Sequence, residues 1–327
     1  MLRCYTQTNG QLMEAPGLGD PGTGPTLIWL DLLNPTPEED AQVESYLSLS
    51  VPTRAEMAEI ELSSRLYHED GAEFMTMTAV SSLDGEEPLK TPITFILKDM
   101  VLVTVRYADP KPFHHFIMRA QRPNVIPCSS GEQVMLGLTE AIIDRAADAL
   151  EKVGDEIDAI SRGVFRVRGT RAMKSQDLQA AIEQIGRKGD LLTMLQESLV
   201  SLGRMTAYHS ALDLNQKKLA KDSKQRVRLI QRDATSLTDH ATFLANKITF
   251  LLDATLGLIN LEQNQIIKIF SVAAVVFLPP TLVASIYGMN FEIIPELHLS
   301  FGYPLALGFM VLSAVLPYLY FKRRGWL

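Results

Sequence analysis

The sequence predicts an α+β domain, followed by long helices and then by two C-terminal transmembrane helices. Strand-like segments alternate with turn residues in the first 130 residues. Twelve of the 17 prolines fall by Pro127 and the next is Pro279. A proline-free run rich in Ala, Leu, Gln, Lys and Arg is typical of long helices. Two apolar segments near the C-terminus each have about the 20 residues that a helix needs to cross a bilayer.

Residues 1–130 read as a mixed α/β domain. Thr36-Pro37-Glu38-Glu39 has the pattern of a helix start, with an N-cap threonine, proline at the first position and acidic residues in the first turn. A second helix is expected near Pro52-Thr53. Gly and Pro between Pro16 and Pro25 predict a loop. Segments rich in β-branched and aromatic residues predict four strands, at Leu27–Leu30, Phe74–Val80, Ile93–Leu97 and Val101–Val105.

Residues 131–222 are expected to form a helical hairpin. Apolar residues recur there at helical spacing, and Gly163 and Gly169-Thr170 predict the turn. A second break is expected between Gly203 and Ser223. A third helix then runs over residues 223–286, and at 1.5 Å per residue it would be about 96 Å long. Such a helix cannot be buried in a small globule, so it must pack on the hairpin or on copies of itself. An apolar stripe supplies that contact: Ile248, Leu251, Leu252, Thr255, Leu258 and Ile259.

The two apolar segments, 266–286 and 303–321, are predicted to be membrane spans. Two buried helices of a soluble core are the alternative, but such helices rarely lack a polar face over this length. The loop 287–302 between the spans contains no Lys or Arg, whereas the tail 322–327 begins with Lys322-Arg323-Arg324. The positive-inside rule therefore places the loop outside and both termini in the cytoplasm, for a multi-pass protein of the plasma (inner) membrane.

Composition excludes several function classes. The 327 residues carry a net charge of −7, which disfavours nucleic acid as a partner and suits cations. Cys4 and Cys128 are the only cysteines and have no metal-binding spacing, so we expect two free thiols. No nucleophile–base constellation, phosphate-binding loop or dinucleotide motif is present, so we expect neither an enzyme nor a bound cofactor. No cleaved signal is visible in residues 1–30.

The first predicted span carries small and polar side chains on one face. They follow one another at steps of three or four residues, starting two turns before the membrane. Such residues are common at any helix–helix contact in a membrane, which is the structural alternative. Several copies around a symmetry axis could instead enclose a pore with these faces inward. The residues are Asn260, Asn264, Ile267, Ser271, Ala274, Leu278, Thr281 and Ser285.

Directly after this span comes Tyr287-Gly288-Met289-Asn290. A pore for a cation that holds its waters tightly should offer neutral oxygens, such as the Asn290 side chain, to the hydrated ion. Glu292 and Glu296 in the loop would attract cations. Alternatively, the motif is only a tight turn with Gly288 or Asn290 in the left-handed conformation. Within the span, Pro279-Pro280 predicts a kink or exposed carbonyls. Three apolar residues could form a gate: Ile267, Phe270 and Leu278.

The Gly-Met-Asn motif after one span, the Pro-Glu pair at 295–296 and the short second span ending in basic residues resemble the CorA family of magnesium transporters. The close resemblance covers residues 260–327. It implies a funnel-shaped homopentamer with one pore helix per subunit, driven by the membrane potential and closed by cytoplasmic Mg²⁺. It also implies a selectivity filter at Gly288, Met289 and Asn290, polar pore rings at Asn264 and Thr281, and an acid, Asp253, near the cytoplasmic mouth.

Three readings of the function follow. The first is channel-like transport of hydrated Mg²⁺, with Co²⁺ and Ni²⁺ as further candidate ions. A related Zn²⁺ transporter is the nearest rival. A scaffold or sensor that is merely anchored in the bilayer belongs to a different class. That reading leaves the polar face and Asn290 without a role. An acidic run on the first long helix, from Asp144 to Asp158, could attract divalent cations or simply pair with basic residues of its neighbours.

Overall fold

The computed structural model describes residues 1–19, 26–85, 87–123, 125–165, 175–216, 221–290, 299 and 301–326. The chain divides into two compact units. The first comprises Met1–Arg166 and Glu183–Leu251. The second comprises Val167–Ile182 and Leu252–Leu327.

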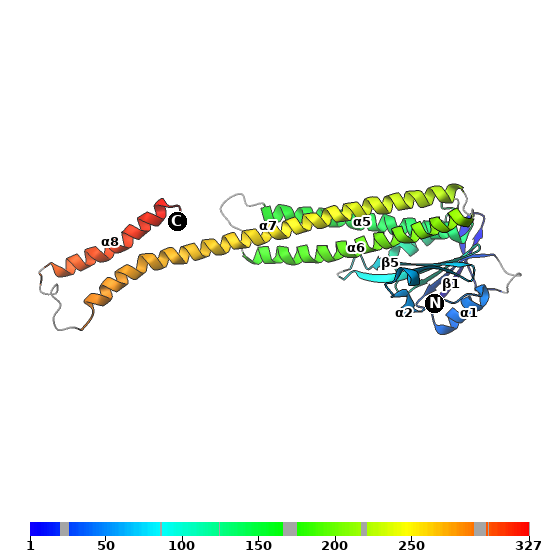
Figure 1. Ribbon diagram of the computed structural model, residues 1–327, viewed down its shortest axis with the longest axis horizontal. Coiled ribbons are helices and arrows are strands. Elements are labelled where there is room, and N and C mark those ends of the chain that lie inside the picture. Colours follow the sequence, from blue (N-terminus) through cyan, green and yellow to red (C-terminus); the bar gives the residue numbers. More distant parts are fainter. Residues whose placement is uncertain are drawn as a thin grey trace. The chain divides into compact units, whose positions relative to one another are not determined.

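Seven strands of the first unit form one mixed sheet in the order β2-β1-β3-β7-β6-β5-β4 (Figure 1). The central β3 and β7 are parallel, and every other neighbouring pair is antiparallel. The four predicted strands are present and extend one to five residues beyond their expected bounds. The strands are β1 (Leu2–Thr8), β2 (Gln11–Ala15), β3 (Leu27–Leu33), β4 (Leu66–Glu69), β5 (Ala72–Ser81), β6 (Leu89–Lys98) and β7 (Val101–Arg106).

The sequence analysis missed β1, β2 and β4. The β1–β2 hairpin turns at Asn9 (φ 52°) and Gly10 (φ 76°), the left-handed pair that a two-residue type I′ turn requires. Asn-Gly between short apolar runs is a hairpin signal, so this pair could have been found. β4 is only four residues long and largely exposed, so its pattern is weak.

Four short helices belong to this unit: α1 (Pro37–Leu47), α2 (Arg54–Met57), α3 (Leu62–Arg65) and α4 (Lys111–Ala120). The predicted start of α1 is confirmed. The Thr36 hydroxyl accepts from the Glu39 amide, and the Glu39 carboxylate accepts from the Thr36 amide, which completes a capping box. The same box at Thr53 and Glu56 starts α2, which ends after one turn.

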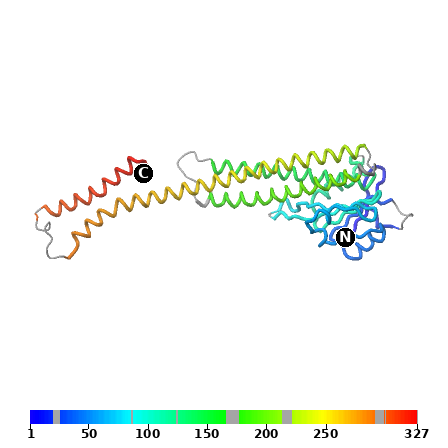
Figure 2. The backbone as a smooth tube through the Cα atoms, viewed as in Figure 1, coloured from blue at the N-terminus to red at the C-terminus, as the bar shows by residue number. Residues whose placement is uncertain are grey.

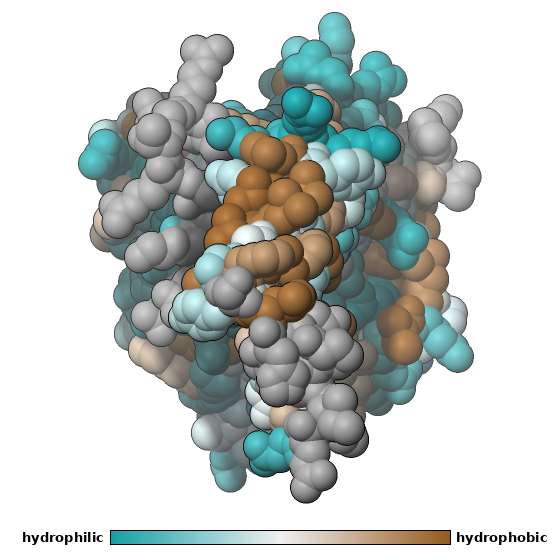
Figure 3. Space-filling view, turned by 90° about the vertical axis from the view of Figure 1, so that its left-hand side faces the viewer, coloured by the Kyte–Doolittle hydropathy of each residue, from teal (hydrophilic) through white to brown (hydrophobic). Residues whose placement is uncertain are grey.

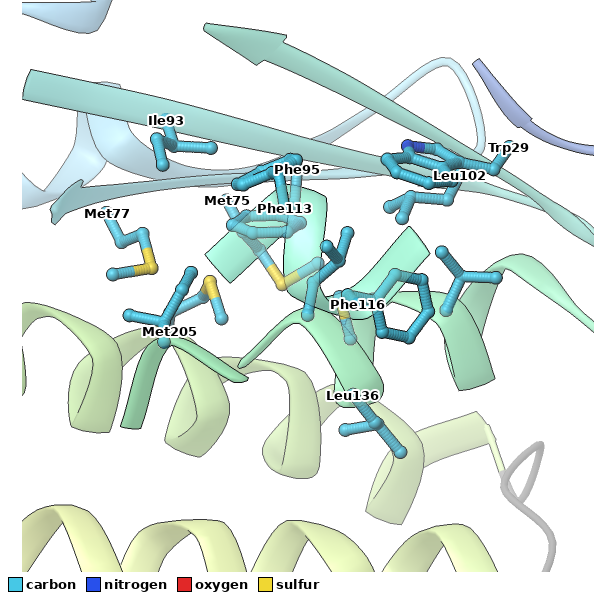
Figure 4. Packing of buried hydrophobic residues seen from close by; sticks show 14 of the residues in the cluster. Trp29, Met75, Met77, Ile93, Phe95, Leu102, Phe113, Phe116, Leu136 and Met205 are labelled. Carbon is cyan, nitrogen blue, oxygen red and sulfur yellow. The ribbon is translucent and has the colours of Figure 1, made fainter. Parts of the chain in front are cut away.

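Both faces of the sheet are covered, because successive residues of its strands point to opposite sides. On one face, Val103 and Phe74 pack in a cluster with Val43 of α1 and Met57 of α2. On the other face, Trp29, Met75 and Phe95 pack against α4 and the long helices. Figure 4 shows this second cluster between the sheet and the helices, with Phe113 and Met205 on the side of the strands and Leu136 pointing away from them toward the lower helices.

Three long helices follow: α5 (Gly131–Phe165), α6 (Ser175–Gln216) and α7 (Lys221–Tyr287). The second predicted break, between Gly203 and Ser223, is confirmed, because α6 ends at Gln216 and α7 begins at Lys221. Gly163 is in the last turn of α5, and Gly203 lies inside α6. A single helical glycine costs only about 1 kcal/mol, which packing of the rest of the helix outweighs. Gly169-Thr170 lies outside the described residues. Within the first unit, α7 packs on the hairpin, with Leu244 close to Gly154 and Ile248 close to Gly189.

α7 is one continuous helix of 67 residues, about 100 Å at 1.5 Å per residue (Figure 2). Its end and α8 (Gly302–Arg323) are both long and apolar enough to span a membrane. Only 6% of the most apolar window of either helix is buried, which argues against the alternative of soluble core helices. In the space-filling view, hydrophobic residues gather in a patch on the surface (Figure 3).

Candidate ion pathway

The polar face of α7 is uncovered along its whole length. All eight of its residues, from Asn260 to Ser285, are exposed. The less exposed line of this helix runs through Val272, Val276, Pro279 and Val283. At 100° per residue that line lies about 140° around the helix from the polar face. The polar face therefore points away from the side on which the second unit buries its own apolar residues.

Asp253 lies on the same face as the polar residues. It precedes Asn260 by seven residues, about two turns, and it is exposed. A carboxylate and then two amides, at Asn260 and Asn264, thus follow one another along one edge of the helix before the apolar span begins. The resemblance alone suggested Asp253, and the helix geometry now supplies an independent reason to place it in line with the stripe.

The candidate gate residues are large, apolar and exposed. Ile267 is 61% exposed, Phe270 71% and Leu278 65%. Pro279 and Pro280 lie inside α7, which continues through them as a helix. At the next residue, the Thr281 hydroxyl donates to the carbonyl oxygen of Phe277 at 2.7 Å and keeps its lone pairs as acceptors. Along the span, turns that carry a hydroxyl-bearing side chain therefore alternate with turns that carry a bulky apolar side chain.

The Gly-Met-Asn motif begins where α7 ends. The Gly288 amide still donates to the Ala284 carbonyl at 3.0 Å, and Met289 donates to Ile286 at 3.3 Å. Neither Gly288 nor Asn290 has a positive φ, so the expected left-handed turn is wrong. A Cβ at Gly288 would lie 3.2 Å from the Ala284 oxygen, a tight contact that a shift of a few tenths of an ångström would relieve. Asn290 is exposed. Glu292 and Glu296 lie outside the described residues.

Aromatic and basic residues gather at one end of the helix pair, a feature that the sequence analysis did not use. The Lys268 ammonium lies 5.9 Å from the centre of the Trp326 ring, and the Arg324 guanidinium lies 5.7 Å from the Tyr320 ring. Such pairs mark the headgroup level of a bilayer. They place the start of the first span and the end of the second at the same membrane surface.

A cluster of charged and histidine side chains at the end of β7 and in the chain that follows has a structural role. Its members are Arg106, Asp109, His114 and His115. Arg106 is 1% exposed and forms a two-bond ion pair with Asp31, at 2.8 and 2.9 Å. Burial opposes its charge, but the hydrogen bonds that it donates to the carboxylates of Asp31 and Asp109 raise the pKa of Arg106. The His114 ring bonds Asp109 at 2.7 Å, and both histidines are exposed. In the described part of the chain no three His, Cys, Asp or Glu side chains could hold a metal ion together.

The acidic run of α5 is partly neutralised by its neighbours. Glu156 pairs with Lys188 of α6, and Asp158 pairs with Lys247 of α7. A third pair joins Glu140 to Arg226 through two hydrogen bonds of 2.8 Å. These contacts support the explanation that the acidic residues of α5 named here pair with basic residues of the neighbouring helices.

The fold and the helix pair define an integral membrane protein whose long α7 leads from a mixed α/β unit into the first of two spans, with a polar face left uncovered. Residues 25–323 match the family described as CorA-like Mg²⁺ transporter protein. The chain is 36% identical over 303 residues to the magnesium transport protein CorA of Haemophilus influenzae (92% of this chain, 93% of that protein). It is 37% identical over 302 residues to the Escherichia coli protein of the same name, covering 92% of each.

The chain therefore belongs to the CorA family. It is a membrane protein with two C-terminal spans and a homologue of transporters rather than of enzymes. The complete structure of the CorA magnesium transporter from Methanocaldococcus jannaschii has the same fold, with a TM-score of 0.76 over 100% of this chain and 99% of that one, at 18% identity. The predicted fold class and family are confirmed.

Proposed function

We propose that this protein mediates the uptake of hydrated Mg²⁺, driven by the membrane potential, through a pore lined by α7 of several identical subunits. The observation that carries the proposal is the uncovered polar face of the first span. A single helix with polar residues exposed to lipid would be costly, whereas a ring of copies turns that face toward water. The family's oligomer would be a homopentamer, with the first unit and both termini in the cytoplasm.

In this arrangement Asn290 forms the filter together with Gly288 and Met289. Its neutral amide oxygen binds the water shell rather than the bare ion, so the ion stays bound weakly enough to leave. Asn264, Ser271, Ala274 and Thr281 line the pore below it. Ile267, Phe270 and Leu278 close it by excluding water, and Glu292 and Glu296 raise the local cation concentration at the outer mouth.

Asp253 concentrates cations at the cytoplasmic mouth. Closure by cytoplasmic Mg²⁺ is the proposed regulation, for which the family resemblance is the support. The residues that would bind the regulatory ion are not assigned. Co²⁺ and Ni²⁺, which are also strongly hydrated divalent ions, are proposed as further substrates.

Flux into liposomes tests the proposal. The full chain is reconstituted, an inside-negative potential is imposed, and uptake of Mg²⁺, Zn²⁺, Co²⁺ and Ni²⁺ is measured in parallel. We expect Asn290→Ala to lower Mg²⁺ uptake at least tenfold while assembly, measured by native mass spectrometry, is unchanged. Gln265→Ala is the matched control, because it removes an amide on the side of α7 opposite the polar face and should leave uptake within twofold.

Three results would contradict the proposal. Unchanged uptake by Asn290→Ala would reject the filter role. A monomer in lipid would reject the shared pore. Flux of Zn²⁺ without Mg²⁺ would favour the zinc alternative, and no flux of any ion from assembled protein would favour the anchored scaffold.

A further inference from the structure

A cavity lies wholly within the first unit, between the edge of the sheet and α6. Its volume is about 700 Å³, which is in the range of small-molecule sites. Strands β5 and β6 supply one wall, α6 supplies the opposite wall, and the segment from Ala58 to Leu66, which includes α3, closes the end. None of the residues of the polar face of α7 lines it.

The cavity carries uncompensated positive charge. Among the described residues that line it, three are basic, Arg65, Lys90 and Arg204, and one is acidic, Glu197. Glu197 is already paired with Lys90 at 2.7 Å. Within the described part of the chain neither arginine has a carboxylate partner, so two guanidinium groups face the cavity with no counter-charge.

The two arginines act on each other. Burial, and after it the positive charge of Arg204, lower the pKa of Arg65 below its ordinary value. Arg65 is held in place by its own hydrogen bonds, from Nε to the Glu59 carbonyl at 2.7 Å and from Nη1 to the Thr78 hydroxyl at 3.1 Å. Bringing two like charges together costs free energy, which an anion between them would recover.

The hydroxyl groups beside the arginines are arranged as donors. Thr78 Oγ1 accepts from Arg65, and Ser201 Oγ accepts from the Thr78 amide at 2.9 Å. A hydroxyl has one proton to donate, and within the described residues neither of these hydroxyls donates to an acceptor. Thr78, Ser201 and both arginines line this one cavity, so their hydroxyl protons and remaining guanidinium N–H groups are available to an acceptor placed in it.

We propose that this cavity binds a phosphorylated small molecule, with its phosphate between Arg65 and Arg204 and within reach of the hydroxyls of Thr78 and Ser201. Planar guanidinium groups match phosphate oxygens in pairs. The volume exceeds that of a phosphate group, and Ile60 and Leu62 at the rim are 91% and 53% exposed. These side chains offer an apolar surface to the rest of the molecule, such as a nucleobase.

Binding there joins α6 to the sheet. Arg204 and Ser201 belong to α6, whereas Thr78 belongs to β5 and Arg65 ends α3. An anion held by all four would add a contact to a junction that already has the Thr78–Ser201 hydrogen bond, the Lys90–Glu197 pair and the core packing of Met205. A bound ligand should therefore raise the unfolding temperature of the first unit in proportion to the logarithm of its concentration above Kd.

The test uses the full chain in detergent, free of Mg²⁺ and with EDTA, at constant ionic strength. AMP is the probe, because it carries a phosphate and a planar base. Binding is followed by broadening of its ³¹P resonance and by titration calorimetry. No ion flux enters this readout, so its failure and a failure of the proposed transport are distinguishable.

We expect AMP to bind with a Kd below about 1 mM, and Arg65→Gln and Arg204→Gln each to weaken it at least tenfold. Arg232→Gln, an exposed arginine of α7 outside the cavity, should change it less than twofold. Inorganic phosphate should compete at higher concentration. Anionic phosphatidylglycerol vesicles are the second arm, because competition by them in place of AMP would assign the phosphate to a lipid headgroup and overturn the soluble ligand.

Arg204 is exposed and unpaired, so its replacement should not unfold the protein, and the fluorescence of Trp29 checks this. Absence of AMP binding to the wild type at 10 mM would overturn the proposal. Equal weakening by Arg232→Gln would also overturn it, because it would indicate attraction by net charge alone.

Discussion

The buried ion pair between Asp31 and Arg106 gives a prediction whose size can be worked out from the structure. Asp31 is 0% exposed and Arg106 is 1% exposed. The Asp31 carboxylate accepts from Arg106 Nε at 2.9 Å and Nη2 at 2.8 Å, and from the Thr104 hydroxyl at 2.8 Å. Thr104 in turn accepts from the indole of Trp29 at 2.9 Å. The substitution Asp31→Asn removes the charge and places amide protons against the guanidinium donors.

We expect Asp31→Asn to lower the free energy of unfolding by about 3–5 kcal/mol. Removing one partner of a buried pair leaves the other charge without compensation, which costs about that amount. Asp109 limits the loss, because it also bonds Arg106 and is 40% exposed. With a urea dependence of about 2–3 kcal/mol per M, the urea concentration at the midpoint of unfolding should fall by about 1–2.5 M.

The chain supplies its own probe. It contains two tryptophans, the buried Trp29 and the exposed Trp326. In a Trp326→Phe background the fluorescence of the full chain in detergent reports only on Trp29, beside the ion pair. Asp99→Asn is the matched control, because Asp99 is in an exposed turn at φ 53°, a conformation that asparagine also adopts readily. Its free energy of unfolding should stay within about 0.5 kcal/mol of that of the wild type. Equal midpoints for Asp31→Asn and Asp99→Asn would refute the reasoning.

Two further predictions use the same assays. At Gly131 a Cβ would lie 2.3 Å from the backbone nitrogen of Leu102, so Gly131→Ala should lower the free energy of unfolding by about 1–3 kcal/mol in the urea titration. Gly186 is on a helix, and its Cβ would have nothing within 4 Å, so Gly186→Ala should instead raise the free energy of unfolding by about 0.5–1 kcal/mol. A loss of stability at both sites would contradict this account. Cys4 and Cys128 are each 3% exposed, and burial raises the pKa of both thiols to about 11, so at pH 8 both are protonated. A thiol reagent at pH 8 should label neither in the folded protein and both in urea, and rapid labelling of the folded protein would show that one of them is accessible.

The candidate pathway could be read from the sequence because its signals are local. A helix repeats every 3.6 residues, so the spacing from Asn260 to Ser285 alone puts these side chains on one face. The apolar lengths, the basic tail and the proline-free run likewise need no knowledge of distant contacts. The start of α1 was predictable for the same reason, because Thr36 and Glu39 complete their capping box within one turn.

Tertiary structure decided everything that depends on residues distant in the chain. Asp31 finds Arg106 across 75 positions, because β3 and β7 are parallel neighbours. The cavity with Arg65 and Arg204 exists only because α6 returns to the edge of the sheet. α6 also continues through Gly203, because packing of the helix outweighs a propensity difference of about 1 kcal/mol. The sequence by itself thus determined the membrane helices and their polar face, through a period that any helix must obey. Which side chains meet across the sheet was left to the fold, because no local pattern encodes the partner of a buried charge.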